Sequence, residues 1–377
     1  MARDRWDVVV AGLGAMGSSV VSELARRGVK VLGLDRFAPP HQWGSTHGRT
    51  RIIREAYFEH PLYVPLLRRA YELWERLEHD GGRRLFHQTG GLMIGPADGP
   101  LVAGAERSAR EHGLPHEMLD AREVRRRFPG LRPAPGTVAL FEPRAGMLLP
   151  EACIEIWHSL ARRAGADLRV ELPLLEWAAK DDGVAVRIES GWVDAGALVL
   201  ATGAWLPDSL NELSLPLTVE RQLFHWFQPL QSGSALGADA CPIALWEYPE
   251  GHLFATFPDL GDGFKAGIHH DGETTTPGTV RREPDAEDER RIRELLERFV
   301  PDAAGPVREA RVCLYTNTPD SHFIIDRHPD SAHVTIISAC SGHGFKFASV
   351  VGEVGADLVL GEHPRFDLSP FAMARFQ

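Results

Sequence analysis

The sequence is poor in cysteine, since its 377 residues include only Cys153, Cys241, Cys313 and Cys340. These lie far apart and form no C-x-x-C pair, the spacing that zinc sites and dithiol active sites use. We therefore expect no metal site, and we expect the protein to work in the reducing cytoplasm. A free cysteine usually fills core space because its thiol behaves as a small hydrophobe, and this is the first interpretation of Cys313 and Cys340.

Long apolar runs and blocks of like charge are also missing. The N-terminal MARDRWDVVVAG has only a short apolar run behind two acidic residues, too short for a signal peptide, and no segment reaches the length of a membrane span. The net charge of −11 comes from acidic residues scattered among 41 lysines and arginines. We expect neither a membrane nor a nucleic acid as a partner, and about two domains or one elaborated α/β unit.

A dinucleotide-binding pattern occupies the first fifty residues. An apolar run at residues 8–10, typical of a parallel strand buried on both faces, leads into AGLGAMG, a G-x-G-x-x-G motif. Apolar residues then recur at helical spacing as far as Gly28, and VKVLGLD predicts a second strand that ends where a carboxylate can accept hydrogen bonds from a ribose. The free N–H groups of the helix N-terminus would face a pyrophosphate. The residues assigned to this site are Gly12, Gly14, Met16, Gly17, Asp35 and Arg36.

Two segments far along the chain complete this predicted domain. ALVLATGAW predicts a buried strand beside the first one, preceded by a β-meander with a hairpin at residues 181–183. A strand at 334–338 then meets the turn SGHG and a helix whose N-terminus faces the ligand. The nucleotide domain is therefore discontinuous, with 1–85, 146–215 and 310–377 in it and 86–145 and 216–309 in a second, substrate domain. The cofactor-binding residues expected in the late segments are Thr202, Gly203, Gly342, Gly344, Phe345 and Lys346.

The segment GSTHGRTRIIREAY carries three arginines. If it is helical from about Thr50, Arg51 and Arg54 share a face and form a fork that suits a carboxylate. The alternative is a solvated basic patch, or ion pairs with Glu55 and Glu59. Spacing alone favours neither interpretation.

Two lysines raise a similar question. GDGFKAGIHH predicts an alternating strand with Lys265, Gly267 and His269 on one face. This face could contact a flat ligand, or it could be the solvent-exposed face of an edge strand. The pattern of the strand alone favours the solvent-exposed face. Lys346 lies at the start of the late helix, where a positive charge is unfavourable to the helix dipole, so we expect an anion as its partner. The alternative interpretation is an ordinary solvated lysine. His343 is interpreted as a hydrogen-bonded turn histidine.

The chain resembles the monomeric sarcosine oxidases and N-methyltryptophan oxidases, flavoproteins that oxidise secondary amino acids. Nearly the whole chain shares the resemblance, which is carried by the first glycine motif, FAPPHQWGSTHGRTRIIREAY, ATGAW, VCLYTNTPDSHFIID, SGHGFKFASVVGE and FDLSPFAMARFQ. The last of these leans toward the N-methyltryptophan branch. The resemblance implies an α/β (α+β) fold, with an FAD-binding Rossmann-like domain of the glutathione-reductase type and a second, antiparallel-sheet substrate domain.

The resemblance also implies how the cofactor is held. In this family the cysteine of the C-x-Y-T segment is joined covalently to FAD, and that position is Cys313. Cys340 is a rival by its place before the SGHG turn, but the resemblance gives it no support. Ser45, His47 and Arg51 are expected close to the flavin.

Substrate and oxygen are assigned by the same resemblance. It places Arg54 and Lys346 on the substrate carboxylate, Lys265 over the flavin where oxygen is reduced, and His269 and Tyr315 along the substrate cavity. The expected catalytic residues are Lys265, Arg51, His269 and Tyr315.

The activity implied is that of an FAD-dependent oxidase of N-methyl amino acids, a monomer that converts a sarcosine-type substrate and O2 to the primary amino acid, formaldehyde and hydrogen peroxide. Arg49 departs from the family's frequent aspartate, and Phe254 and Ala255 stand where relatives have tyrosines. Replacing a tyrosine by the alanine would enlarge the amine side of the pocket and remove a hydroxyl. The alternatives are an oxidase of N-methyltryptophan or another bulky or cyclic secondary amino acid, an FAD amine dehydrogenase, and a non-catalytic flavin-binding or redox-sensing protein.

Overall fold

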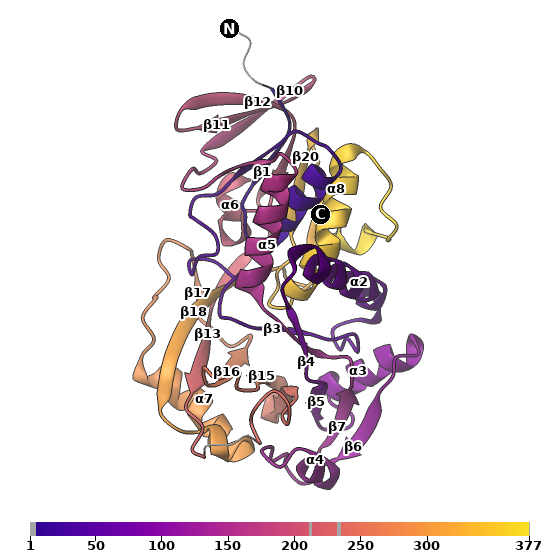
Figure 1. Ribbon diagram of the computed structural model, residues 1–377, viewed down its shortest axis with the longest axis vertical. Coiled ribbons are helices and arrows are strands. Elements are labelled where there is room, and N and C mark those ends of the chain that lie inside the picture. Colours follow the sequence, from indigo (N-terminus) through magenta and orange to yellow (C-terminus); the bar gives the residue numbers. More distant parts are fainter. Residues whose placement is uncertain (1–4, 211–212, 232–234, 377) are drawn as a thin grey trace.

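The computed structural model describes residues 5–210, 213–231 and 235–376, and two large sheets dominate it. In Figure 1 the sheet that contains β1 lies in the upper half and the sheet that contains β13 to β16 in the lower half. The chain passes between the halves several times, so each is built from segments far apart in the sequence.

The upper sheet has eight strands with a parallel centre. The first strand, β1 (Trp6–Ala11), lies between β2 (Val31–Leu34) and β12 (Gly191–Leu200), while β9 (Asp167–Arg169) extends the sheet from β2 and β20 (Ser331–Ser338) pairs with β12. The strands predicted at 8–10, 197–200 and 334–338 are therefore confirmed, and the late strand β12 lies directly beside β1 as expected. Three antiparallel strands complete the sheet: β10 (Glu176–Lys180), β11 (Gly183–Ile188) and β19 (Ile324–His328).

Helices cover this sheet and contact one another. The predicted first helix is α1 (Ala15–Arg26), and it packs against α5 (Pro150–Arg163) and α8 (Ala348–Leu360), while α2 (Val64–Gly81) packs on α5 and α8. The late helix starts after a 3₁₀ turn at Phe345–Phe347, so the predicted Lys346 lies in that turn. Apolar residues of all four helices share one core with β1.

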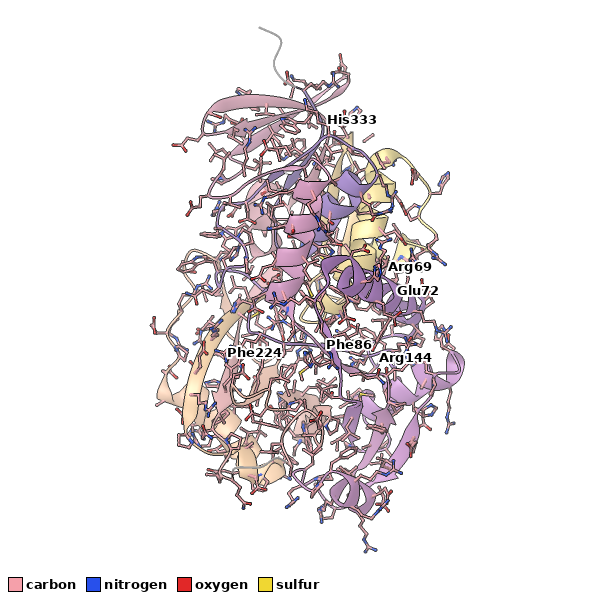
Figure 2. The ribbon with its side chains drawn as sticks, viewed as in Figure 1. Arg69, Glu72, Phe86, Arg144, Phe224 and His333 are labelled. Atoms are coloured by element: carbon pink, nitrogen blue, oxygen red, sulfur yellow. The ribbon has the colours of Figure 1, made fainter. Side chains whose placement is uncertain are left out.

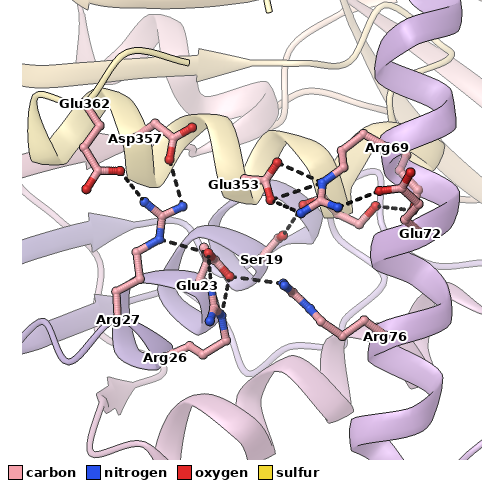
Figure 3. A network of polar contacts seen from close by, with 12 residues as sticks. Ser19, Glu23, Arg26, Arg27, Arg69, Glu72, Arg76, Glu353, Asp357 and Glu362 are labelled. Carbon is pink, nitrogen blue, oxygen red and sulfur yellow. Dashed lines mark hydrogen bonds and ion pairs between the residues drawn. The ribbon is translucent and has the colours of Figure 1, made fainter. Parts of the chain in front are cut away.

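A network of ion pairs joins α1, α2 and α8 where they meet (Figure 3). Glu23 of α1 is 5% exposed and accepts hydrogen bonds from Arg26, Arg27 and Arg76. Arg69 of α2 reaches Glu353 of α8 at 2.6 Å. Because Glu23 is buried, this carboxylate needs its cationic partners. The network joins three of the helices that cover the upper sheet.

The lower sheet has nine strands and is antiparallel except where β14 pairs with β5. Helix α3 (Pro100–Glu111) shares a core with Met93 and Leu140 on one face of this sheet, and α4 (Ala121–Arg127) and α7 (Ala286–Phe299) share a core with Leu92, Ile94 and Ala139 on the other face. The predicted alternating strand is β16, and it lies between β13 and β15, so the edge-strand interpretation is wrong. The strands are β5 (Gly91–Gly95), β6 (Glu117–Asp120), β7 (Val138–Glu142), β13 (Thr218–Phe227), β14 (Ile243–Tyr248), β15 (His252–Phe257), β16 (Phe264–His269), β17 (Thr274–Thr275) and β18 (Val307–Asn317).

A small sheet joins the two halves. It consists of β3 (Arg51–Ile53), β8 (Gly146–Leu148) and β4 (Phe86–Gln88). The helix considered from Thr50 is therefore wrong, because residues 51–53 are extended and pair with β8. Isoleucines at 52 and 53 favour this strand, since β-branched side chains fit a pleated sheet better than a helix.

Within the described residues, no helix has both the length and the apolar character that crossing a bilayer requires.

Candidate active site

One cavity of about 750 Å³ is lined by residues from both halves of the molecule. It runs from the glycine-rich turn after β1 to the strands of the lower sheet. Three residues assigned to the site, Gly17, His47 and Lys265, do not line it. The assigned residues that line it are Gly12, Gly14, Met16, Asp35, Arg36, Ser45, Arg51, Arg54, Thr202, Gly203, His269, Cys313, Tyr315, Gly342, Gly344, Phe345 and Lys346.

The turn after β1 requires its glycines. Gly12 has φ +91°, and a Cβ there would lie 2.4 Å from the carbonyl oxygen of Ala201; a Cβ on Gly17 would lie 1.7 Å from the Gly12 oxygen. The turn is fixed to β2 by Asp35, whose Oδ2 accepts from Leu13 N at 2.6 Å. Burial raises the pKa of this carboxyl, and its backbone donors oppose the shift. Asp35 therefore lies at the carboxyl end of β2, beside the glycine turn.

This end of the cavity fits a flavin adenine dinucleotide. Helix α1 begins at Ala15 without a side-chain cap from Gly14, and Ala15 N donates to Thr46 Oγ1 at 3.3 Å. Gly14, Ala15 and Met16 line the cavity at this N-terminus. The hydroxyl of Thr202 is buried and has no hydrogen-bond partner within the described part of the chain. Arg36 stacks over Trp205 at 5.7 Å and closes the far side. A ligand with phosphates and hydroxyl groups matches these donors.

Cys313 lies in the middle of β18 and is 1% exposed. Its Sγ accepts a hydrogen bond from Arg51 Nη2 at 3.7 Å, and the same guanidinium donates to Ser45 O at 2.7 Å. Burial raises the pKa of the thiol, whereas the charges of Arg51 and Lys265 lower it. The hydroxyl of Ser45 donates to Leu314 O, which ties the 45–51 segment to β18. Burial is the larger effect, so the pKa of Cys313 stays raised, and the two cations only reduce that shift.

Lys265 is 2% exposed on the face of β16 that the alternation predicted. Its Nζ donates to Gly48 O at 2.8 Å and to the carbonyl and hydroxyl oxygens of Thr50 at 2.7 and 3.1 Å. The rings of Phe224 and Phe257 lie 4.1 and 4.3 Å from the ammonium. Burial, together with Arg51, lowers the pKa of Lys265. The three acceptors match the three N–H groups of an ammonium, so the site is built for the charged form.

Arg54 and Lys346 meet at one aromatic ring. The Arg54 guanidinium and the Lys346 ammonium lie 4.4 and 5.2 Å from the centroid of Tyr57. Arg54 also pairs with Glu59 at 2.7 Å, the ion pair named as an alternative, yet it is 2% exposed and not part of a solvated patch. Lys346 is 6% exposed, so the solvated-lysine interpretation is wrong. Burial and Arg54 lower the pKa of Lys346 to about 7.

The two cations differ in the donors that they leave unused. Arg54 Nε has no partner among the described residues, but it is buried away from the cavity surface. Lys346 Nζ donates to His343 O at 2.6 Å and to Tyr57 Oη at 3.4 Å, which uses two of its three N–H groups. Both residues line the cavity, so a carboxylate there would meet the remaining N–H group of Lys346 and the positive charge of Arg54.

The third side of this region is aromatic and polar. His269 Nδ1 lies 3.1 Å from Tyr315 Oη, and burial lowers the pKa of the imidazole, so a neutral ring is present. His343 contacts Tyr57 Oη at 2.6 Å and Ser321 O at 2.9 Å, which confirms it as a hydrogen-bonded turn histidine. His269 and Tyr315 thus line the cavity as one hydrogen-bonded unit.

His47 lies apart from the other assigned residues. It lines a second cavity of about 340 Å³ with Trp43, Glu151 and Arg311. Both of its ring nitrogens are buried without a partner in the described chain, and burial lowers its pKa to about 3. Cys340 lines the main cavity and its Sγ accepts from Thr316 N at 3.3 Å, so it is more than a core filler.

Several residues of the site carried no assignment from the sequence. Tyr57 joins the two cations, and Phe224 and Phe257 enclose Lys265. Phe257 is predictable from alternation, because it faces Lys265 in the β15–β16 pairing. Tyr57 lies outside any helix or strand, so no periodic pattern reveals it.

Comparison with known proteins agrees with this geometry. Residues 7–358 match the model of the FAD dependent oxidoreductase family. The chain is 45% identical to the monomeric sarcosine oxidase of Streptomyces avermitilis over 94% of both chains, and 39% identical to that of Bacillus sp. (strain B-0618) over 98% of this chain and 96% of the relative. It is 36% identical to the N-methyl-L-tryptophan oxidase of Salmonella newport over 99% of both.

Solved structures show the same fold. NikD, an unusual amino acid oxidase essential for nikkomycin biosynthesis, superposes with a TM-score of 0.85 at 25% identity, covering 98% of this chain and 97% of that chain. The L-proline dehydrogenase from P. horikoshii gives 0.86 at 22% identity, covering 99% and 98%.

The chain is therefore a flavin-dependent oxidoreductase, and it belongs to the FAD dependent oxidoreductase family. Within that family its similarity is to the sarcosine and N-methyltryptophan oxidases, so the predicted family and fold class are confirmed.

Proposed function

We propose that the protein is a cytoplasmic, monomeric FAD-dependent oxidase of N-methyl amino acids, which uses O2 to convert a sarcosine-type substrate to the primary amino acid, formaldehyde and hydrogen peroxide. The observation that carries this proposal is the pair of buried cations, Arg54 and Lys346, which both line the cavity that also fits FAD, with one N–H group of Lys346 unused. A protein that only stores or senses a flavin has no need of a carboxylate site there.

The residues bind and orient the amine. When bound, FAD supplies the redox chemistry by taking two electrons from the substrate and returning them to oxygen. Arg54 and Lys346 hold the carboxylate, which fixes the amine against the cofactor. The buried surroundings favour the neutral amine that the reaction requires, and the neutral His269 and Tyr315 line the cavity without adding charge.

Lys265 and Arg51 act on the other side of the site. Lys265 presents a fixed positive charge that stabilises negative charge developing where oxygen is reduced. Arg51 donates to Cys313 Sγ, and its charge opposes the rise in the thiol pKa that burial causes. These roles complete the proposed catalytic set of Lys265, Arg51, His269 and Tyr315.

Cys313 is the proposed point of covalent attachment for FAD, because its thiol is buried in the cavity beside Arg51. Acid precipitation should leave the yellow colour with the wild-type protein, whereas Cys313→Ser should release its flavin. Cys340→Ser is the matched control, since Cys340 lines the same cavity. Flavin release from the wild type, or from the Cys340 variant alone, would show that the attachment point is not Cys313.

The proposed domain division departs from the two large sheets at β18, because it places residues 310–317 in the FAD-binding domain although this strand pairs with β13 of the lower sheet. We place the FAD-binding domain at 1–85, 146–215 and 310–377 and the substrate domain at 86–145 and 216–309. The strand β18 (Val307–Asn317) supports a close joint between them, because it carries Cys313 and Tyr315 while pairing with β13 of the lower sheet.

A bulky secondary amino acid is the second candidate substrate. Ala255 lines the cavity and pairs with Leu245 on β14 and Gly267 on β16. These three neighbouring positions of the sheet therefore carry only small or aliphatic side chains. Ile52 and Phe58 add apolar surface to the same cavity. This surface favours an N-methyl amino acid with an apolar side chain.

Oxygen consumption and peroxide formation across a substrate panel test the proposal. The panel contains sarcosine, N-methyl amino acids with larger apolar side chains, proline and N-methyl amines without a carboxylate. Turnover of N-methyl amino acids with stoichiometric peroxide is expected. Turnover only with an artificial electron acceptor would identify a dehydrogenase instead.

A further inference from the structure

The guanidinium of Arg54 is held by the segment that follows it, residues 55–59. Its Nη1 donates to Ala56 O at 2.9 Å, and its Nη2 donates to both carboxylate oxygens of Glu59 at 2.7 and 3.0 Å. The rings of Tyr57 and Phe58 lie 4.4 and 4.7 Å from its central carbon. The position of this cation in the cavity therefore depends on the conformation of residues 55–59.

Residues 55–59 lie outside any helix or strand, so no regular hydrogen-bond ladder fixes them. Their backbone is held at Tyr57 O by the Ser108 hydroxyl, which donates at 2.5 Å, and at its N-terminal end by Glu142, the last residue of β7 in the lower sheet. Glu142 Oε1 accepts from Glu55 N at 2.7 Å and Oε2 accepts from Ala56 N at 2.8 Å. Glu142 is 1% exposed, so these bonds do not compete with bulk water.

We propose that Glu142 is a positioning residue for the substrate carboxylate: by accepting from two consecutive backbone N–H groups, it fixes residues 55–59 and through them the Arg54 guanidinium. This inference rests on the proposed role of Arg54. A carboxylate suits the task because both of its oxygens are acceptors, whereas an amide would turn one N–H donor toward a backbone N–H.

The surroundings of Glu142 act on its charge in both directions, and the two backbone donors are among the groups that favour the charged form. Burial raises its pKa to about 7, the two backbone donors lower it, Glu55 raises it further and Arg54 opposes Glu55. Glu55 itself is paired with Arg144, which Figure 2 places at the waist of the molecule. Burying a carboxylate costs free energy unless its oxygens accept hydrogen bonds. The oxygens of Glu142 accept from the backbone N–H groups of Glu55 and Ala56.

Glu142→Gln tests the proposal by keeping the size of the side chain and replacing one acceptor. We expect KM for an N-methyl amino acid to rise roughly 10- to 100-fold, because a small misplacement of a binding group has effects of this order. KM for an N-methyl amine without a carboxylate should stay within about threefold, and so should kcat for both.

Glu78 offers a control for replacing a carboxylate by an amide at two consecutive backbone N–H groups. Its Oε1 alone accepts from Leu85 N at 2.6 Å and Phe86 N at 2.9 Å, whereas Glu142 uses both oxygens, and neither bond involves residues 54–59. Glu78→Gln should leave both KM values unchanged. If Glu142→Gln does not fold, Glu142→Asp replaces it, because it keeps the charge and withdraws the oxygens by one methylene.

The same substitution in an Arg54→Ala background separates the possible results. If Glu142 acts through Arg54, it should add no further rise in KM there. An additive effect, or an equal rise for substrates with and without a carboxylate, overturns the proposed role of Glu142. If Arg54→Ala itself affects both substrate types equally, the role of Arg54 fails first and the proposed carboxylate site with it.

Discussion

Lys265 and Lys346 are two buried lysines in one enzyme, and their surroundings differ. Lys265 donates to two carbonyl oxygens and one hydroxyl, all from residues 48–50, and lies among the rings of Phe224, Phe257 and Trp226. Lys346 donates to one carbonyl oxygen and to a phenol at 3.4 Å, and it lies near a second cation, Arg54.

The difference shows how burial can serve two purposes. Burial and Arg51 lower the pKa of Lys265 well below its usual value, but its three acceptors match all three N–H groups of an ammonium without any ligand. Around Lys346 the protein leaves the ammonium incompletely matched, so an anion must complete its site. One lysine therefore provides a standing charge, and the other binds a charge that the substrate brings.

The largest effect is expected from removing the standing charge. Lys265→Met keeps the length and apolar stem of the side chain and should preserve the fold. Reoxidation of the reduced flavin by O2 should slow roughly 1,000-fold, because a preorganised charge in a site without water stabilises developing negative charge strongly. Anaerobic reduction by substrate should change only modestly. Stopped-flow measurement of the two half-reactions decides this, and a wild-type rate of reoxidation would assign oxygen reduction to another group.

The nucleotide half could be predicted from the sequence because local patterns determine it. Glycines at 12, 14 and 17, the apolar strand before them and Asp35 after the next strand each follow a rule of backbone geometry or periodicity. The pairing of β12 with β1, about 190 residues later, also followed from its apolar run and the ATG turn.

The substrate half was less predictable, because its contacts come from irregular segments. The sequence suggested that Arg51 and Arg54 share one face of a helix. In the structure residues 51–53 form a short strand, yet both arginines line the cavity. Arg54 does so because residues 55–59 fold back on it, and no periodicity encodes that loop. The burial of Lys265 depends on residues 48–50, which are distant in sequence from β16.

Arg54→Ala tests the proposed carboxylate site, where Lys346 lies beside Arg54. Its loss should weaken binding of N-methyl amino acids by about 2 to 3 kcal/mol, which is roughly 30- to 150-fold in KM, since it removes a charge-assisted contact in a buried site. An N-methyl amine without a carboxylate should be affected little. Steady-state kinetics with both substrates provide the measurement, and equal losses would contradict the assignment.

Ala255→Tyr fills the space on β15 between the levels of Lys265 and His269. The added ring should lower kcat/KM for N-methyl amino acids with large apolar side chains by roughly 10-fold, because a filled pocket excludes the side chain. Sarcosine, which has no side chain, should be converted nearly as before. A parallel loss for both substrates would show that Ala255 does not border the side-chain pocket.

The smallest expected effect concerns the proton on Lys346. Burial and Arg54 lower its pKa to about 7, whereas Glu59 opposes them. The free enzyme therefore carries this ammonium below about pH 7 and loses it above, so a carboxylate that binds at higher pH must restore the proton. Affinity for propionate, which stays ionised from about pH 6 to about pH 9, should be constant below pH 7 and fall roughly 3- to 10-fold over the next pH unit.

Titration of the flavin absorbance with propionate measures that affinity, and Lys346→Met is the control, because it should bind more weakly at low pH and lose the pH dependence. A wild-type affinity that does not change with pH would mean that Lys346 keeps its proton over this range. The two lysines would then differ only in the hydrogen-bond acceptors around them.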